Sequence, residues 1–134
     1  MVRLLVAYGA TLVPMLLLDS VWLSVMGSRL YRPTLGDMAL DGVRLVPALL
    51  FYALYPAGLV FLAVWPALKA GGPLTAALQG GVFGLVAYAT YDLTNQATLR
   101  NWSTTLSLVD IGWGTVLSAA AAAFGCWVTA KLAG

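Results

Sequence analysis

Four long apolar stretches dominate the chain, and only short polar, glycine-rich or proline-rich segments separate them. They cover about residues 4–26, 45–68, 74–99 and 104–130, each near the ~20 residues that a helix needs to cross a bilayer. Short connections place consecutive helices side by side in opposite directions. We therefore predict an all-α polytopic membrane protein, in which residues 1–134 form one domain, an antiparallel bundle of four transmembrane helices.

The composition agrees with a lipid environment. Hydrophobic residues make up 61% of the chain and charged residues only 9%, and the mean hydropathy is +0.90. Soluble domains carry about 25% charged residues, so a globule with so few charges would precipitate from water. The lipid bilayer is accordingly the first partner that we expect.

The residue types that are scarce limit the functions open to the chain. Histidine is absent, which removes the commonest zinc and haem ligand, and Cys126 is the single cysteine. We expect no cofactor and no metal site, and neither an internal disulfide nor a Cys-x-x-Cys redox pair. The basic residues, which leave a net charge of +2, form no dense cluster, so we expect no nucleic-acid partner.

The first apolar stretch begins like a signal peptide, with Arg3 ahead of an apolar run. The run is too long for a signal core, carries Asp19 and lacks a cleavage site, so we predict a retained helix. Gly27 and Ser28 are predicted to end this helix. In the loop that follows, Pro33 either starts a short interfacial helix or belongs to a solvated loop.

Four spans place both ends of the chain on one side of the membrane. The basic residues nearly tie between the two sides: Arg3, Lys69 and Lys131 on the side of the ends, and Arg29, Arg32, Arg44 and Arg100 on the other. We predict that the ends are cytoplasmic, because their side carries no acidic residue and basic residues favour the cytoplasmic side.

Three aspartates interrupt the apolar stretches at a common depth. Asp19 and Asp92 each precede the end of their predicted helix by seven residues, and Asp110 follows the start of its helix by six. At ~1.5 Å per residue, each lies roughly 10 Å from one membrane face, and Tyr52 reaches this level from the second helix. An aspartate at mid-membrane costs ~2.5–3.5 kcal/mol, so we expect all three to face inward and share one polar network.

Side chains on the same helix faces complete a candidate polar or ligand-binding cluster. Asp-x-x-Trp occurs at Asp19/Trp22 and again at Asp110/Trp113, which indicates an indole donor near each carboxylate. Since desolvation and mutual repulsion oppose three anions, we expect at least one aspartate to hold a proton at neutral pH. The candidate set is Asp19, Asp92, Asp110, Asn95, Thr94, Tyr52, Tyr88, Trp22 and Trp113.

Two arginines and three glycines bear on how the cluster is held. Arg44 and Arg100 enter from the same side as the aspartates and could pair with them. Gly80 and Gly84 form a Gly-x-x-x-Gly step that permits close helix packing, and Gly114 is the small residue on the fourth helix. Glycine is also common in membrane helices without such a role. Equally, the polar groups could join the helices through hydrogen bonds alone.

Together these residues resemble a known family. The run from Tyr88 to Asn95, four residues after Gly84, resembles the signature of a bacterial family of small four-helix integral membrane proteins catalogued as domain of unknown function 2177. Its other landmarks resemble Leu18-Asp19-x-x-Trp22-Leu23, Phe51-Tyr52 with Gly58, and Asp110-x-x-Trp113-Gly114. The resemblance covers essentially the whole chain. It implies the four-helix fold and a multi-pass location in the bacterial inner membrane, and it implies no activity.

Three functions remain open. The first is binding or transport of a proton, a cation or a small amphiphile, because carboxylates beside Thr94 and Asn95 offer hard oxygen ligands. The second is an enzyme or enzyme accessory in membrane lipid (fatty-acid) modification, with an aspartate as general acid and tyrosines such as Tyr55 shaping a lipid pocket. The third is a structural membrane subunit. No nucleotide, phosphate or metal motif favours an enzyme, so binding ranks first, with a lipid, a small ion and a second copy of the chain as partners.

Overall fold

The computed structural model describes residues 1–134 as an all-helical chain without strands. The four long helices are α1 (Val2–Met26), α3 (Leu45–Leu59), α5 (Gly72–Thr98) and α6 (Thr104–Ala133). Shorter helical turns follow α1 and α3: η1 (Gly27–Tyr31), α2 (Arg32–Leu35), η2 (Gly36–Met38), η3 (Val60–Val64) and α4 (Trp65–Lys69). The predicted bounds lie within three residues of the observed ones when α3, η3 and α4 are taken together as Leu45–Lys69.

Three helical segments are long and apolar enough to cross a membrane, namely Val2–Met38, Leu45–Lys69 and Thr104–Ala133. Three of the four predicted spans thus correspond to helical segments that could cross a membrane. Helix α5 has sufficient length, with 27 residues, but glycines and polar side chains such as Gln79 and Thr90 dilute its apolar content.

Large apolar side chains cover the outside of the helices. Leu5 is 64% exposed, Leu54 68% and Phe61 75%. A monomeric soluble protein rarely exposes apolar surface on this scale, because water would drive it to associate. The exposed surface therefore suits contact with hydrocarbon.

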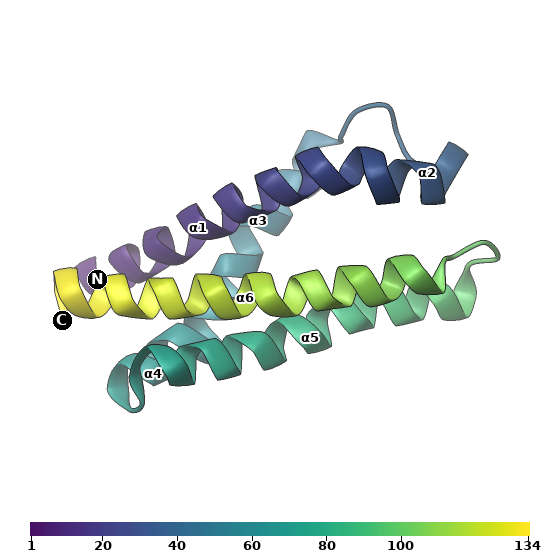
Figure 1. Cartoon of the computed structure of the whole chain (residues 1–134). Helices are drawn as coiled ribbons and strands as arrows, with labels where there is room; N and C mark the ends of the chain where they lie inside the picture. Colours follow the sequence, from purple (N-terminus) through teal and green to yellow (C-terminus); the bar gives the residue numbers. More distant parts are fainter.

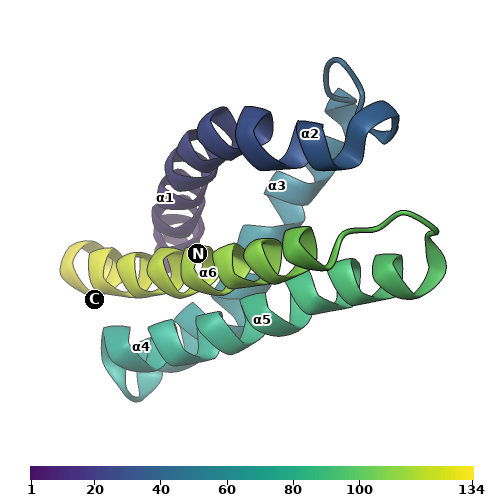
Figure 2. The same cartoon turned by 45° about the vertical axis from the view of Figure 1, so that its right-hand side comes forward.

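The long helices run back and forth between two ends of the molecule (Figure 1). Both termini and the α4–α5 turn lie at one end, and α2 and the α5–α6 loop lie at the other. Helices α5 and α6 lie side by side in both views and form the most extensive contact, whereas α1 packs on α6 and splays away from it towards α2 (Figure 2). The splay separates α1 from α5 at the end where the three aspartates lie.

Small residues bring α5 and α6 close together. A Cβ atom at Gly80 would lie 2.6 Å from the Cβ of Ala122 and 2.8 Å from the carbonyl oxygen of Ser118. A Cβ at Gly84 would collide with the carbonyl oxygen of Gly114 and with the side chain of Ser118. Both α5 glycines thus face α6, and their missing side chains set the spacing of the two helices.

The first helical segment continues past the predicted end. Gly27 keeps right-handed helical angles, with φ −56° and ψ −45°, and the chain passes through the π-helical turn η1 into α2. The α-helix ends at Met26, as predicted, but Gly27 and Ser28 do not interrupt the helical path, because glycine does so only where the backbone turns left-handed or a cap forms. Pro33 lies in the first turn of α2, so the short helix, rather than the solvated loop, is present.

We predict that Gly84→Leu lowers the melting temperature of the detergent-solubilised protein sharply, because the new side chain would force α5 away from α6. Overpacking a close contact costs ~1–3 kcal/mol or more. Gly112→Leu is the matched control, since Gly112 lies on α6 with nothing within 4 Å of its missing Cβ. Equal melting temperatures for the two variants would contradict the close contact.

Candidate functional site

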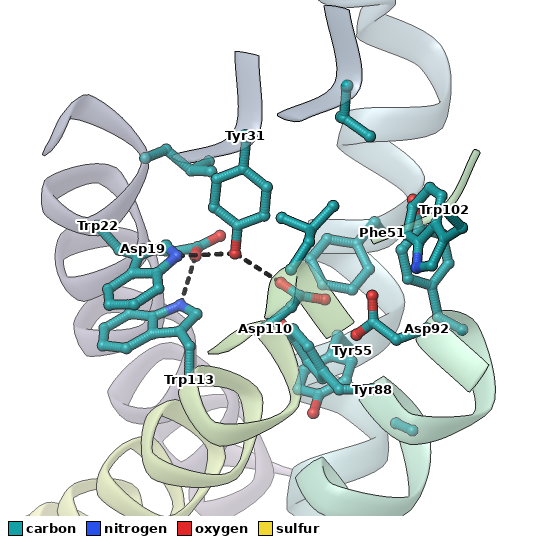
Figure 3. Close-up of a pocket in the computed structure, with 15 residues that line it drawn as sticks. Asp19, Trp22, Tyr31, Phe51, Tyr55, Tyr88, Asp92, Trp102, Asp110 and Trp113 are labelled. Carbon is teal, nitrogen blue, oxygen red and sulfur yellow. Dashed lines mark hydrogen bonds between the residues drawn. The ribbon is translucent and has the colours of Figure 1, made fainter. Parts of the chain in front are cut away.

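A cavity of about 450 Å³ lies between the helices at the end that holds α2 and the α5–α6 loop. Side chains from α1, η1, α2, α3, α5 and α6 line it, together with Trp102 from the α5–α6 loop. Most of the lining is apolar or aromatic, and the exceptions are Asp19, Asp92 and Asp110. The three aspartates thus border one cavity, each from a different helix (Figure 3).

Asp19 has a hydrogen-bond donor on each of its carboxyl oxygens. The indole Nε1 of Trp113, on α6, donates to Oδ1 at 3.0 Å, and the hydroxyl of Tyr52, on α3, donates to Oδ2. Asp19 is only 7% exposed, so both donors replace water that the carboxyl group would otherwise need. Asp19 therefore ties α1 to both α6 and α3.

Two consecutive hydrogen bonds connect Trp22 on α1 to Asp110 on α6. The indole Nε1 of Trp22 donates to the hydroxyl oxygen of Tyr31 at 3.0 Å, and that hydroxyl donates to Oδ1 of Asp110 at 2.7 Å (Figure 3). Tyr31 belongs to η1, so the π-helical turn after α1 supplies the link to α6. Neither tryptophan donates to the aspartate of its own Asp-x-x-Trp motif. Trp113 donates to Asp19, and Trp22 is linked to Asp110 through the hydroxyl of Tyr31.

The two tryptophans that belong to these pairs stack on one another. The ring centroids of Trp22 and Trp113 are 4.4 Å apart and the planes differ by 3°. Aromatic pairs of this kind contribute ~0.5–1.5 kcal/mol beyond the area they bury. The stack fixes the orientation of both indole rings. The N–H of Trp113, which donates to Asp19, and the N–H of Trp22, which donates to Tyr31, are therefore positioned together.

Asp92 differs from the other two aspartates. It is 1% exposed, and neither of its carboxyl oxygens has a hydrogen-bond partner. The carboxyl group of Asp110 lies beside it, and the two groups point towards each other in Figure 3. Two carboxylates cannot hydrogen-bond to each other unless one holds a proton, since an ionised carboxylate only accepts. Asp92 is thus a buried acceptor on the cavity wall without a donor from the protein.

The remaining predicted residues divide into two groups. Tyr88 lines the cavity and its ring covers Gly114, where a Cβ atom would collide with it. Tyr52 touches the cluster through Asp19 but lies outside the lining. Thr94 is exposed and donates to the backbone carbonyl of Tyr91 at 3.1 Å on its own helix, and Asn95 is half-buried outside the lining.

Neither Arg44 nor Arg100 reaches the cavity lining, so the aspartates have no basic neighbour there. No group of three or more histidine, cysteine, aspartate or glutamate side chains is placed to hold a metal ion. The polar contacts of the cavity come from indole and phenol groups instead.

Several lining residues lie outside the candidate set derived from the sequence. The aromatic ones are Tyr31, Phe51, Tyr55, Tyr91 and Trp102. Tyr31 and Trp102 belong to segments that the sequence marks as loops, and only the continuation of the first helix through η1 brings Tyr31 back towards α6. Phe51 and Tyr91 sit beside predicted residues, Tyr52 and Asp92, and both belong to the motifs that resemble the family's landmarks.

We predict that Asp19→Leu destabilises the protein more than Asp19→Asn. Leucine would leave the indole of Trp113 and the hydroxyl of Tyr52 buried without an acceptor, at ~1–3 kcal/mol for each group. Asparagine keeps one oxygen that accepts. Melting temperatures in detergent would rank wild type highest and Asp19→Leu lowest, and the reverse order of the two variants would show that these donors do not need Asp19.

Comparison with known proteins identifies a family but no characterised relative. No curated protein and no solved structure matches the chain. The model of the family described as Predicted membrane protein (DUF2177) matches residues 4–127. Because this match covers nearly the whole chain, as the resemblance of its motifs implied, the chain belongs to this family of predicted membrane proteins of unknown function.

Proposed function

We propose that this protein binds a small amphiphile inside the membrane. The main support is the cavity of about 450 Å³, whose wall is mainly apolar and aromatic but includes three aspartates. Ligand pockets typically measure ~300–1,000 Å³ and combine apolar walls with a few polar groups that fix orientation. An amphiphile matches both parts of this wall.

The lining assigns a place to each part of such a ligand. Phe51, Ala87 and Leu106 offer apolar contacts for a hydrocarbon chain. Asp92 and Asp110 offer carboxyl oxygens for a polar end, and Asp92 has both oxygens free of protein donors. The ligand would then satisfy a buried acceptor that otherwise costs free energy.

The other functions considered fit this wall less well. A purely structural subunit would be expected to give each buried carboxyl group a donor from the protein, whereas Asp92 has none and borders a cavity. A path for protons or inorganic cations needs a continuous series of polar groups, whereas this lining is mostly apolar. A role beside a lipid-modifying enzyme is compatible with amphiphile binding, and it would use the same cavity.

We also propose that α5 crosses the bilayer with the three more apolar segments, which makes an antiparallel four-span bundle. A helix of 27 residues is about 40 Å long, which is sufficient to cross. Its polar side chains Asp92 and Tyr88 border the cavity rather than lipid, which supports a buried position in the membrane. The location proposed is the bacterial inner membrane, with both ends of the chain in the cytoplasm.

We predict that labelling of single cysteines in a Cys126→Ala background reports this topology. A membrane-impermeant maleimide should label Lys69→Cys and Gly134→Cys only in inside-out vesicles, because both positions lie at the end of the molecule that we place in the cytoplasm. Asp37→Cys and Asn101→Cys should react only in right-side-out vesicles. Labelling of Lys69→Cys and Asn101→Cys from the same side would show that α5 does not cross.

We predict that a bulkier residue at Ala87, which lines the cavity, weakens amphiphile binding. The probe is dodecanol brominated at its tail, which quenches the cavity tryptophans Trp22, Trp102 and Trp113 when it binds. Ala87→Phe should raise the probe concentration for half-maximal quenching about tenfold or more, since overpacking costs ~1–3 kcal/mol.

The matched control for this test is Ala97→Phe, because Ala97 lies on the same helix but is exposed and outside the cavity. The probe should quench the tryptophan fluorescence of this variant at the same concentrations as that of the wild type. Quenching that never saturates in the wild type, or that Ala87→Phe leaves unchanged, would contradict binding in the cavity.

A further inference from the structure

The three aspartates of the cavity receive unequal numbers of hydrogen bonds. Asp19 receives two, one on each oxygen, and Asp110 receives one, from Tyr31. Asp92 receives none, although it is 1% exposed and lines the cavity. Because a buried acceptor without a donor is costly, this carboxyl group points to a ligand that brings its own donors.

The charge of the cavity specifies the ligand further. Its lining contains three carboxyl groups and no lysine, arginine or histidine. The carboxyl groups of Asp92 and Asp110 also face each other, so a donor placed between them meets acceptors from two residues (Figure 3). A neutral hydroxyl brings one donor and no charge, whereas a primary ammonium brings three donors and a positive charge.

The aromatic rings beside Asp92 also favour a positively charged head group. Tyr91 and Trp102 both line the cavity and meet edge to face, with ring centroids 5.8 Å apart and planes at 83°. Tyr88, one helical turn before Asp92, adds a third ring. The faces of aromatic rings attract cations, and the attraction grows where water is excluded. Carboxyl groups and aromatic rings thus surround one end of the cavity.

We propose, on the basis of the proposed amphiphile binding, that the ligand is a single-chain amphiphile with a primary ammonium head group, held between Asp92 and Asp110. The ammonium donates to both oxygens of Asp92 and to Asp110. Its hydrocarbon chain extends along the apolar wall towards Phe51 and Leu106. Asp19 keeps its donors Trp113 and Tyr52 and serves to fix the helices around the site.

A proton held between Asp92 and Asp110 is the competing explanation. It would join the two carboxyl groups by one hydrogen bond, and it would leave the other oxygen of Asp92 without a donor. In that case the cavity would have no preference for a charged head group. The affinities of amphiphiles that differ only in their head group distinguish the two explanations.

The experiment compares dodecylamine, dodecyltrimethylammonium and dodecanol on the whole protein in a non-ionic detergent at neutral pH, by isothermal titration calorimetry. The primary amine should bind at least about tenfold more tightly than the other two, since charge-assisted hydrogen bonds are the stronger ones. The quaternary ammonium carries the charge but no N–H donor, so it separates charge from hydrogen bonding.

Asp92→Asn should remove the preference for the amine while dodecanol binding is retained, which also shows that the variant is folded. Asp37→Asn is the matched control, because Asp37 is exposed and outside the cavity, and it should keep the preference. If Asp92→Asn does not fold, Asp110→Asn carries the same expectation, and the ranking of the three probes on the wild type decides by itself.

Dodecanol or the quaternary ammonium binding as tightly as the amine would overturn the ammonium assignment, and so would a preference that survives Asp92→Asn. If dodecanol still binds in those cases, amphiphile binding stands and only the head group is wrong. If none of the three probes binds the wild type in a saturable way, the proposed function itself fails.

Discussion

Carboxyl groups inside an apolar helix bundle depend on the supply of hydrogen-bond donors, and here that supply comes almost entirely from aromatic side chains. Indole and phenol groups can lie against hydrocarbon and still present one N–H or O–H donor. Trp113 and Tyr52 donate to Asp19, and Tyr31 donates to Asp110. The same rings that satisfy the carboxyl groups also form the wall of the cavity, so its polarity and its shape have one origin.

The helix packing explains why the cavity lies where it does. Gly80 and Gly84 let α5 and α6 meet closely, and the stacked pair of Trp22 and Trp113 fills the space between α1 and α6. Towards α2, α1 splays away from α6 (Figure 2), and side chains from both α1 and α5 line the cavity at that end. Asp92 lies on the wall of this cavity and has no donor from the protein.

The sequence was sufficient to predict the helices and the positions of the three aspartates. It was insufficient to predict which side chains donate hydrogen bonds to the aspartates. Apolar stretches of bilayer length carry a strong signal, so the helix ends were predicted within a few residues. The partners of Asp19 and Asp110 depend on how the helices rotate against one another, which no local pattern encodes. Tyr31 is the clearest case, because a π-helical turn that glycine did not interrupt carries it back to α6.

Helix α5, which we propose as a fourth membrane span, shows where the apolar signal of the sequence becomes weak. Residues that line a cavity or a close helix contact are polar or small, and they lower the apolar content of α5, on which the signal depends. Gly84 and Asp92, for example, look unfavourable for a membrane helix when taken singly. Gly84 faces α6 and Asp92 lines the cavity, so neither side chain faces outward from the bundle.

We propose that the space beside Asp92 holds a ligand and is not closed by the protein. A crystal structure grown in a lipidic cubic phase with dodecylamine tests it most directly. We predict elongated density in the cavity, with one end within hydrogen-bond distance of both oxygens of Asp92. A cavity filled by side chains such as Phe51 and Tyr88, with no ligand density beside Asp92, would contradict it.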